Sequence, residues 1–183
     1  MTAALLVIDV QMAFVARREA GHAWGNPQAE TKIAALLAGF RSKDMPVWHV
    51  HHHGTDPRDD FHASAAGAVV QPCAAPLAGE PVVIKQTSSA FVNTGLEAGL
   101  RAAGIETLVI AGGAANFCVE STTRMASDLG FRVTLAEDAL INFGSRLRDG
   151  RRVPAAEVLA MSLANLDGEF ARVAPTATLI AAL

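Results

Sequence analysis

Short apolar runs alternate with helix-like segments along almost the whole chain, and this alternation limits the fold more than any other feature. The predicted strands are residues 4–10, 46–51, 81–85, 106–111, 131–136 and 171–174. The predicted helices are residues 27–41, 94–104, 118–129, 154–165 and 176–183. Strands that are apolar along their whole length are buried on both faces, as in parallel sheets covered by helices. The pattern therefore predicts a Rossmann-like α/β fold with helices on both sides of a parallel sheet.

The composition indicates one domain over residues 1–183 and excludes several classes of protein. Hydrophobic residues make up 51% of the chain and charged residues 18%, which is typical of a well-buried globular domain. The net charge of −3 offers no electrostatic case for binding nucleic acid. No apolar run reaches the length of about 20 residues that a spanning helix needs. The N-terminal segment lacks the basic region of a signal peptide, and the chain has only two cysteines, so we expect a cytoplasmic protein.

Cys118 is the strongest candidate for a reactive side chain. It follows the apolar run at residues 107–111 and two glycines, at the predicted start of a helix. Unpaired backbone N–H groups and the helix dipole at such a position favour the thiolate, which is the nucleophilic form of cysteine. Free cysteines are, however, often buried and inert, so the local sequence alone leaves a packing role open. Cys73 has no neighbouring acid or base in sequence, and we interpret it as structural or as a surface thiol.

Two further chemical side chains, Asp9 and Lys85, end predicted strands. In open parallel sheets, ligands bind beyond the carboxyl ends of the strands, so we expect both residues to gather there with Cys118. Taken singly, Asp9 could be a strand-end cap and Lys85 a solvated edge residue. Taken together, the three supply what a cysteine hydrolase needs: Cys118 as nucleophile, Asp9 as proton acceptor and Lys85 as a positive charge that favours the thiolate. Backbone N–H groups of residues 112–118 could hold the oxyanion.

Four sequence motifs resemble those of the isochorismatase-like cysteine hydrolases. They are D-V-Q-M-A-F at residues 9–14, K-Q-T-S-S-A-F at 85–91, G-G-A-A-N-F-C-V at 112–119 and the pair D-A at 138–139 after the fifth predicted strand. The resemblance implies a three-layer α/β/α fold with a six-stranded parallel sheet and a catalytic Asp9–Lys85–Cys118 triad. It also implies a cis peptide before Ala114, with the amides of Ala114 and Cys118 facing the oxyanion. Gly113 replaces the valine that is usual in the family.

The resemblance favours hydrolysis of a C–N bond, in an amide or carbamoyl compound, through a thioester-type intermediate on Cys118. An isochorismatase-type vinyl ether hydrolase is the first alternative, although many such enzymes lack the cysteine. The second is a catalytically idle binding protein of the same fold. Trp24 is a further candidate for an apolar pocket wall. The predicted substrate contacts are Gln11, Phe14, His52, Ser89, Phe91, Asn116 and Phe117.

A histidine cluster at residues 49–53 lies where the related nicotinamidases carry a metal site of the form D-x-H. Histidine can ligate zinc, and strand alternation would put His49, His51 and His53 on one side. The carboxylate of the motif is absent, so we expect no metal and no other cofactor, and a polar contact to substrate from His52 or His53.

We expect a small-molecule substrate and a homo-oligomer. Relatives of this fold commonly form dimers or tetramers, so the resemblance implies a homodimer or homotetramer. Residues 63–78 form a long apolar stretch with few charges. A lone monomer rarely exposes such a surface. This stretch should therefore either fold over its own active site or lie against another subunit, and we expect it, or the helix after Cys118, to contribute to a subunit interface.

Overall fold

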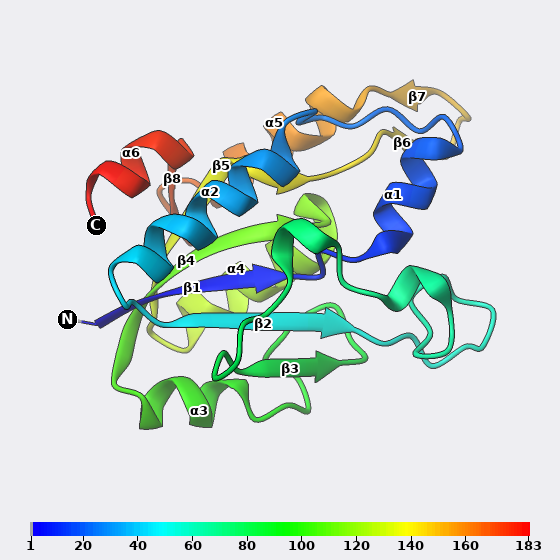
Figure 1. Ribbon diagram of the computed structural model, residues 1–183. Coiled ribbons are helices and arrows are strands. Elements are labelled where there is room, and N and C mark those ends of the chain that lie inside the picture. The colour runs from blue at the N-terminus through cyan, green and yellow to red at the C-terminus, as the bar shows by residue number, and fades with distance from the viewer. Residues whose placement is uncertain (1) are drawn as a thin grey trace.

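The computed structural model describes residues 2–183, and its centre is a six-stranded sheet in which every neighbouring pair is parallel (Figure 1). The strand order is β3-β2-β1-β4-β5-β8. The strands are β1 (Thr2–Ile8), β2 (Val47–His52), β3 (Val82–Lys85), β4 (Ile105–Gly113), β5 (Arg132–Ile141) and β8 (Arg172–Ala174). The crossover order puts the carboxyl ends of all six strands at one edge. The predicted fold class and sheet are confirmed.

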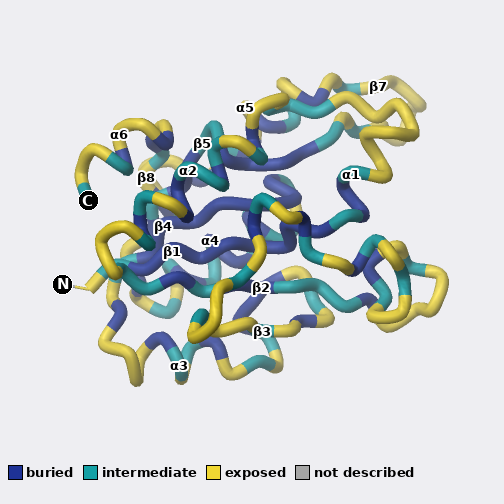
Figure 2. Tube along the Cα trace, viewed as in Figure 1, coloured by how far each residue is buried: buried dark blue, intermediate teal, exposed yellow. Residues whose placement is uncertain are grey.

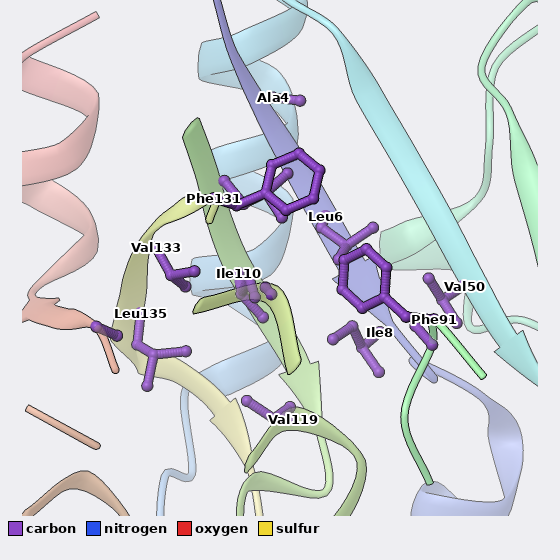
Figure 3. Packing of buried hydrophobic residues seen from close by; sticks show 14 of the residues in the cluster. Ala4, Leu6, Ile8, Val50, Phe91, Ile110, Val119, Phe131, Val133 and Leu135 are labelled. Atoms are coloured by element: carbon purple, nitrogen blue, oxygen red, sulfur yellow. The ribbon is translucent and has the colours of Figure 1, made fainter. Parts of the chain in front are cut away.

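Helices cover both faces of the sheet and make the three layers. They are α1 (Met12–Glu19), α2 (Ala29–Ser42), α3 (Leu96–Ala102), α4 (Glu120–Asp128), α5 (Ala155–Leu166) and α6 (Thr176–Ala181). Successive side chains of β1 point to opposite faces, as strand geometry requires. Leu5 and Val7 pack with residues of α1, α2 and α6, while Leu6 and Ile8 pack with those of α3, α4 and α5. Figure 3 shows the second of these two clusters.

Burial is deepest along the central strands and falls toward the loops at the carboxyl edge (Figure 2). Leu5, Leu6 and Ile8 of β1 have no exposed surface. Burying each such aliphatic side chain stabilises a fold by about 1.5–3 kcal/mol. The rigid middle of the sheet therefore positions whatever side chains end its strands.

Three parts of the structure differ from the sequence prediction. Helix α1 was not predicted, because it buries only Ala13 and Phe14 and its N-cap residue makes no side-chain cap bond. The short antiparallel pair β6 (Ser145–Arg146) and β7 (Arg152–Val153) was also not predicted, since its strands are only two residues long. Strand β5 continues beyond residue 136, so Asp138 lies within it and accepts hydrogen bonds from the amide and hydroxyl of Thr176 at 2.7 and 2.6 Å.

The apolar segment at residues 63–78 folds against its own chain. It contains two 3-10 turns, η1 (Ala66–Ala68) and η2 (Pro72–Ala74), which contact α1 and α2 respectively. Ala74 is fully buried, and Gln71 donates a side-chain hydrogen bond of 3.0 Å to the carbonyl oxygen of Gln11. Val69 and Leu77 of the same segment stay exposed. The expected homo-oligomer stays a prediction. Within the described chain, no helix combines the length and apolar character needed to cross a bilayer.

Candidate active site

Three neighbouring strands deliver side chains to one point at the carboxyl edge of the sheet. Asp9 follows the last residue of β1, and its backbone N–H donates to the carbonyl oxygen of Val50 at 2.8 Å. His52 and Lys85 end β2 and β3 and are register partners. Asp9 has a φ of 52°, which is uncommon for a residue other than glycine and turns the chain sharply at this point. The convergence expected from the sequence is confirmed.

The ammonium group of Lys85 lies at the centre of this cluster. Its Nζ is 2.7 Å from Oδ2 of Asp9 and 3.2 Å from Sγ of Cys118. It also donates to the carbonyl oxygen of Thr87 at 3.1 Å and lies 3.3 Å from Nδ1 of His52. Lys85 and Asp9 are each 1% exposed. Lys85 therefore links the Asp9 carboxylate and the Cys118 thiol in one contact network, and both Lys85 and Asp9 are shielded from solvent.

Burial raises the pKa of Asp9 to about 6, against the opposing effect of the Lys85 charge. Its Oδ1 atom is buried and has no hydrogen-bond partner among the described residues. A carboxylate with a free oxygen and a raised pKa near neutrality can accept a proton and release it again. These properties suit the role of proton acceptor that the sequence predicts for Asp9.

Burial also raises the pKa of the Cys118 thiol to about 12, and the negative charge of Asp9 adds to this shift while Lys85 opposes it. The thiolate predicted from the sequence is therefore wrong for the free protein. The sequence argument considered the helix terminus and the lysine and omitted desolvation, which is the larger effect here. The cluster holds a neutral thiol beside a carboxylate that can take its proton.

The loop that carries Cys118 leaves β4 through two glycines. Gly112 has a φ of 118°, and a Cβ there would overlap the carbonyl oxygen of Ile8. A Cβ on Gly113 would lie 2.7 Å from Cε2 of Phe14, so the valine usual in relatives would need that ring to move. The peptide bond between Gly113 and Ala114 is cis, as the resemblance implies.

A five-residue π-helical turn, η3 (Ala115–Val119), follows this bond and precedes α4. The amides of Phe117 and Val119 both donate to the carbonyl oxygen of Ala114, at 3.0 and 3.2 Å. Cys118 thus lies in the π turn rather than in the first turn of the α-helix, which corrects the predicted helix start. Of the two amides expected to face an oxyanion, that of Cys118 lies in this turn and that of Ala114 belongs to the residue just before it.

A pocket of about 500 Å³ opens beside the π turn. Ala114, Asn116 and Phe117 form one wall of it, and Phe117 is 61% exposed. The remaining wall comes from α1, the loop around Asp60 and the chain after β5. Its residues are Ala16, Arg17, Ala20, His22, Asp60, Phe143, Gly144 and Ser145. Pockets of this volume accommodate small organic ligands.

Several predicted substrate contacts lie elsewhere. Gln11 has no exposed surface: its Nε2 donates to the carbonyl oxygens of His52 and Ala68 at 3.0 and 2.8 Å, and its Oε1 accepts from the amide of His52 at 2.8 Å. Phe91 stacks on Phe131 in the core. The predicted contacts from Gln11 and Phe91 stay predictions: the Gln11 amide is engaged by backbone groups, and Phe91 does not line this pocket.

Ser89 and Phe14 are also engaged by the protein. The Ser89 hydroxyl lies 3.3 Å from Sδ of Met125 and accepts the amide of Phe91 at 3.3 Å. Phe14 is 3% exposed and makes an edge contact with Phe61 at a centroid distance of 5.2 Å. Neither residue lines this pocket, and their direct contact with a substrate stays a prediction.

His52, Asn116 and Phe117 do lie at the site. The ring of His52 packs edge-on against Phe61, and burial together with the Lys85 charge lowers its pKa, so the ring is neutral. Asn116 and Phe117 line the pocket. Trp24, proposed as an apolar wall, packs on Phe143 with the rings 5.8 Å apart and stands behind a pocket-lining residue.

The histidine cluster divides between two faces of β2. His49 is 1% exposed and pairs with Glu80 through an Nε2–Oε2 distance of 2.9 Å, while the His49 and His51 rings lie 6.4 Å apart on one side. His52 points to the other side, toward Lys85. Over residues 2–183, no three side chains of His, Cys, Asp or Glu are grouped so that they could hold a metal ion. The alternation predicted for the cluster is confirmed for His49 and His51.

The sequence prediction missed Arg17 and Phe143 as pocket-lining residues. Arg17 lies on α1, which itself was not predicted, and Phe143 follows the unpredicted extension of β5. The available signal was the arginine pair at residues 17–18, close in sequence to Asp9 at the strand end.

The chain resembles known proteins in both sequence and fold. The isochorismatase domain profile matches residues 3–174. A crystal structure of a Chromobacterium violaceum protein assigned to the hydrolases of the isochorismatase family superposes with a TM-score of 0.93 and 43% identity, covering 99% of this chain and 93% of that one. The isochorismatase family protein YrdC of Bacillus subtilis is 35% identical over 97% of this chain and 94% of its own length. An N-carbamoylsarcosine amidase from Arthrobacter is 27% identical over 97% of this chain and 69% of its own.

Proposed function

The chain belongs to the isochorismatase family of hydrolases, and from that premise we propose that it cleaves a C–N bond in a small amide or carbamoyl compound, with Cys118 as nucleophile. The similarity to an N-carbamoylsarcosine amidase supports a C–N bond as the target. One observation carries the proposal. Lys85 contacts both Asp9 and Cys118, at 2.7 and 3.2 Å, while the second oxygen of Asp9 is buried and unpartnered.

The first half of the proposed reaction forms a covalent intermediate. The Cys118 sulfur attacks the carbonyl carbon as its proton passes to the Asp9 carboxylate, so no free thiolate has to accumulate. This coupling suits a thiol whose pKa is about 12 beside a carboxyl whose pKa is about 6. The oxyanion that forms is held by the amides of Ala114 and Cys118. Asp9 then gives its proton to the leaving nitrogen, and the C–N bond breaks to leave a thioester.

The second half returns the protein to its starting state. A water molecule loses a proton to Asp9 and attacks the thioester carbon, and the resulting intermediate expels the sulfur, which regains the proton. The products are an amine or ammonia and a carboxylic or carbamic acid. The positive charge of Lys85 compensates the carboxylate and the developing negative charge on sulfur.

A panel of primary amides and N-carbamoyl compounds, assayed for ammonia release, tests this proposal. We expect turnover by the wild type, a fall of at least about a thousandfold in the Cys118→Ala variant, and a mass increase on Cys118 equal to the acyl group when the reaction is quenched early. The matched control is Cys73→Ala, whose thiol lies on η2 away from the site. Equal turnover by Cys118→Ala, or pyruvate release from isochorismate without any amidase activity, would contradict the proposal.

A further inference from the structure

We propose that the substrate carries a carboxylate at the end opposite the scissile bond, and that Arg17 recognises it. This inference deepens the proposed function, because it identifies the class of amide or carbamoyl compound that enters the site. It rests on the pocket between the π turn and α1, on the unpaired charge of Arg17, and on the distribution of arginines around the pocket mouth.

The pocket connects the proposed oxyanion site to Arg17. Ala114 and Phe117 line the cavity of about 500 Å³, and Arg17 and His22 line the same cavity. A ligand whose carbonyl oxygen meets the amide of Ala114 therefore extends along the cavity toward α1. Phe117 and Phe143 also line the cavity, so a ring or alkyl group suits the middle of the ligand.

Arg17 has an available charge. It has no carboxylate partner among residues 2–183, and its guanidinium lies over the Phe61 ring, 5.9 Å from the centroid. Asp60 also lines the pocket without pairing with it. Its neighbour Arg18 differs, because it pairs with Glu30 at 3.2 Å and covers Trp24 at 4.5 Å. Arg17 is exposed and lines the cavity, where a guanidinium can bind a carboxylate through two parallel hydrogen bonds.

Several arginines lie close to the pocket, although the whole chain has a net charge of −3 and Asp60 also lines the pocket. The segment from β6 to β7 carries Arg146, Arg148, Arg151 and Arg152, with Asp149 as its one acidic residue. A second cavity, lined by Arg146, Arg152 and His22, adjoins the first and shares four of its lining residues. Figure 1 shows α1 and this hairpin at the same edge of the molecule. Such a field attracts small anions and raises their local concentration.

Calorimetric titration with benzoate and with its neutral isostere benzamide, using Cys118→Ala so that no turnover occurs, tests the binding claim. We expect benzoate to bind at least about fivefold more tightly than benzamide, a loss of at least about fivefold for benzoate in the added Arg17→Gln change, and a change below about twofold for the matched Arg18→Gln control. Equal affinities for the two probes, or benzoate binding that Arg17→Gln leaves unchanged, would overturn the inference.

Turnover separates this inference from the proposed function. In the wild type, 4-carbamoylbenzoate should release ammonia with a kcat/KM at least about tenfold above that of terephthalamide, and Arg17→Gln should raise KM for the anionic amide while changing kcat little. Arg17-dependent binding of benzoate without ammonia release from any amide would refute C–N hydrolysis and leave the carboxylate site standing. Ammonia release that favours the neutral amide would refute the carboxylate site and leave the hydrolase standing.

Discussion

Two carboxylates at opposite ends of β3 are both held by basic side chains, yet their pKa values shift in opposite directions. Glu80, just before β3, accepts from Arg41 at 2.7 and 2.8 Å, from His49 at 2.9 Å and from the amide of Leu77 at 2.8 Å. The hydrogen bonds from Arg41 are the largest influence on its pKa, which falls to about 2. Asp9, which meets Lys85 at the other end of β3, has a pKa near 6.

The difference lies in how completely each carboxylate is satisfied. Both oxygens of Glu80 have partners, so the charged form is strongly favoured and the group ties α2 and β2 to the chain before β3. Asp9 is more deeply buried, and one of its oxygens has no partner. Desolvation then outweighs the attraction of one ammonium group. A saturated ion cluster stabilises structure, whereas an unsaturated one keeps a carboxylate ready to exchange protons.

The largest expected effect comes from removing one carboxylate at a time. Asp9→Asn keeps the shape but cannot accept the thiol proton, so kcat should fall by at least about a thousandfold. Glu80→Gln should change kcat by less than about threefold, because Glu80 lies away from the pocket. Steady-state kinetics at pH 7.5, with circular dichroism as the folding control, measures both. Comparable losses in the two variants would break the comparison.

Glu80→Gln, which should change kcat little, should lower the stability of the fold. The pKa of Glu80 is about 2 in the folded chain and 4.5 for a free side chain, so its ionisation stabilises the fold at pH values above 4.5. This contribution is lost as the pH falls from 4.5 toward 2. Glu80→Gln should therefore unfold at lower urea concentration at pH 7, and the gap to wild type should narrow below pH 4.5. A stability difference between the two proteins that grows below pH 4.5 would show that ionised Glu80 does not stabilise the fold.

The pH dependence of activity should report Asp9. Since the base must be ionised, kcat/KM should rise with pH as one proton leaves, with a midpoint near 6, and should be about tenfold below its plateau at pH 5. The thiol, whose pKa is about 12, adds no further rise between pH 7 and 10. Buffers of constant ionic strength are needed. A midpoint near 4, or a second rise near pH 8.5, would identify an ordinary carboxyl or an ordinary thiol.

The smallest effect tests the geometry of the Glu80 cluster. Arg41→Lys keeps the charge but loses the paired hydrogen bonds to the two oxygens, so we expect about 1 kcal/mol lower stability and a higher pKa for Glu80. Acid unfolding monitored by fluorescence should then begin at higher pH than in wild type, with Lys32→Arg, on the same helix, as the control for a change of cation. Unaltered acid unfolding would mean that charge alone holds the cluster.

Local sequence was sufficient to predict the sheet and the convergence of Asp9, Lys85 and Cys118. The apolar strands are long enough for their pattern to determine type, and parallel pairing then brings their ends together. The hydrophobic pattern did not predict elements that are short or weakly amphipathic, namely α1 and the pair β6–β7. Helix α1 contributes Ala16 and Arg17 to the pocket wall and β6 contributes Ser145, so the substrate side of the site was the less predictable one.

The state of the reactive groups could not be predicted from residue types. Whether Cys118 is a thiol or a thiolate depends on the balance between desolvation, Asp9 and Lys85, and that balance is set by distances in three dimensions. The same holds for Glu80, whose partners Arg41 and His49 are 39 and 31 residues away in sequence. Likewise, Gln11 belongs to a motif near the site, yet its amide is used by the backbone.

The side chain of Gln11 keeps the end of β2 hydrogen-bonded at the point where β1 leaves the sheet. Its side-chain amide gives to the carbonyl of His52 and takes from the N–H of the same residue, as the main chain of an adjacent strand would. The Gln11 side chain thereby adds one more hydrogen-bonded pair between the chain after β1 and strand β2, beyond the point where β1 turns away at Asp9. The backbone of β1 is free to diverge, while the last residue of β2 stays paired as if the strand continued. A glutamate of the same size would lack the N–H donor for the His52 carbonyl, so this pair of hydrogen bonds needs a side-chain amide.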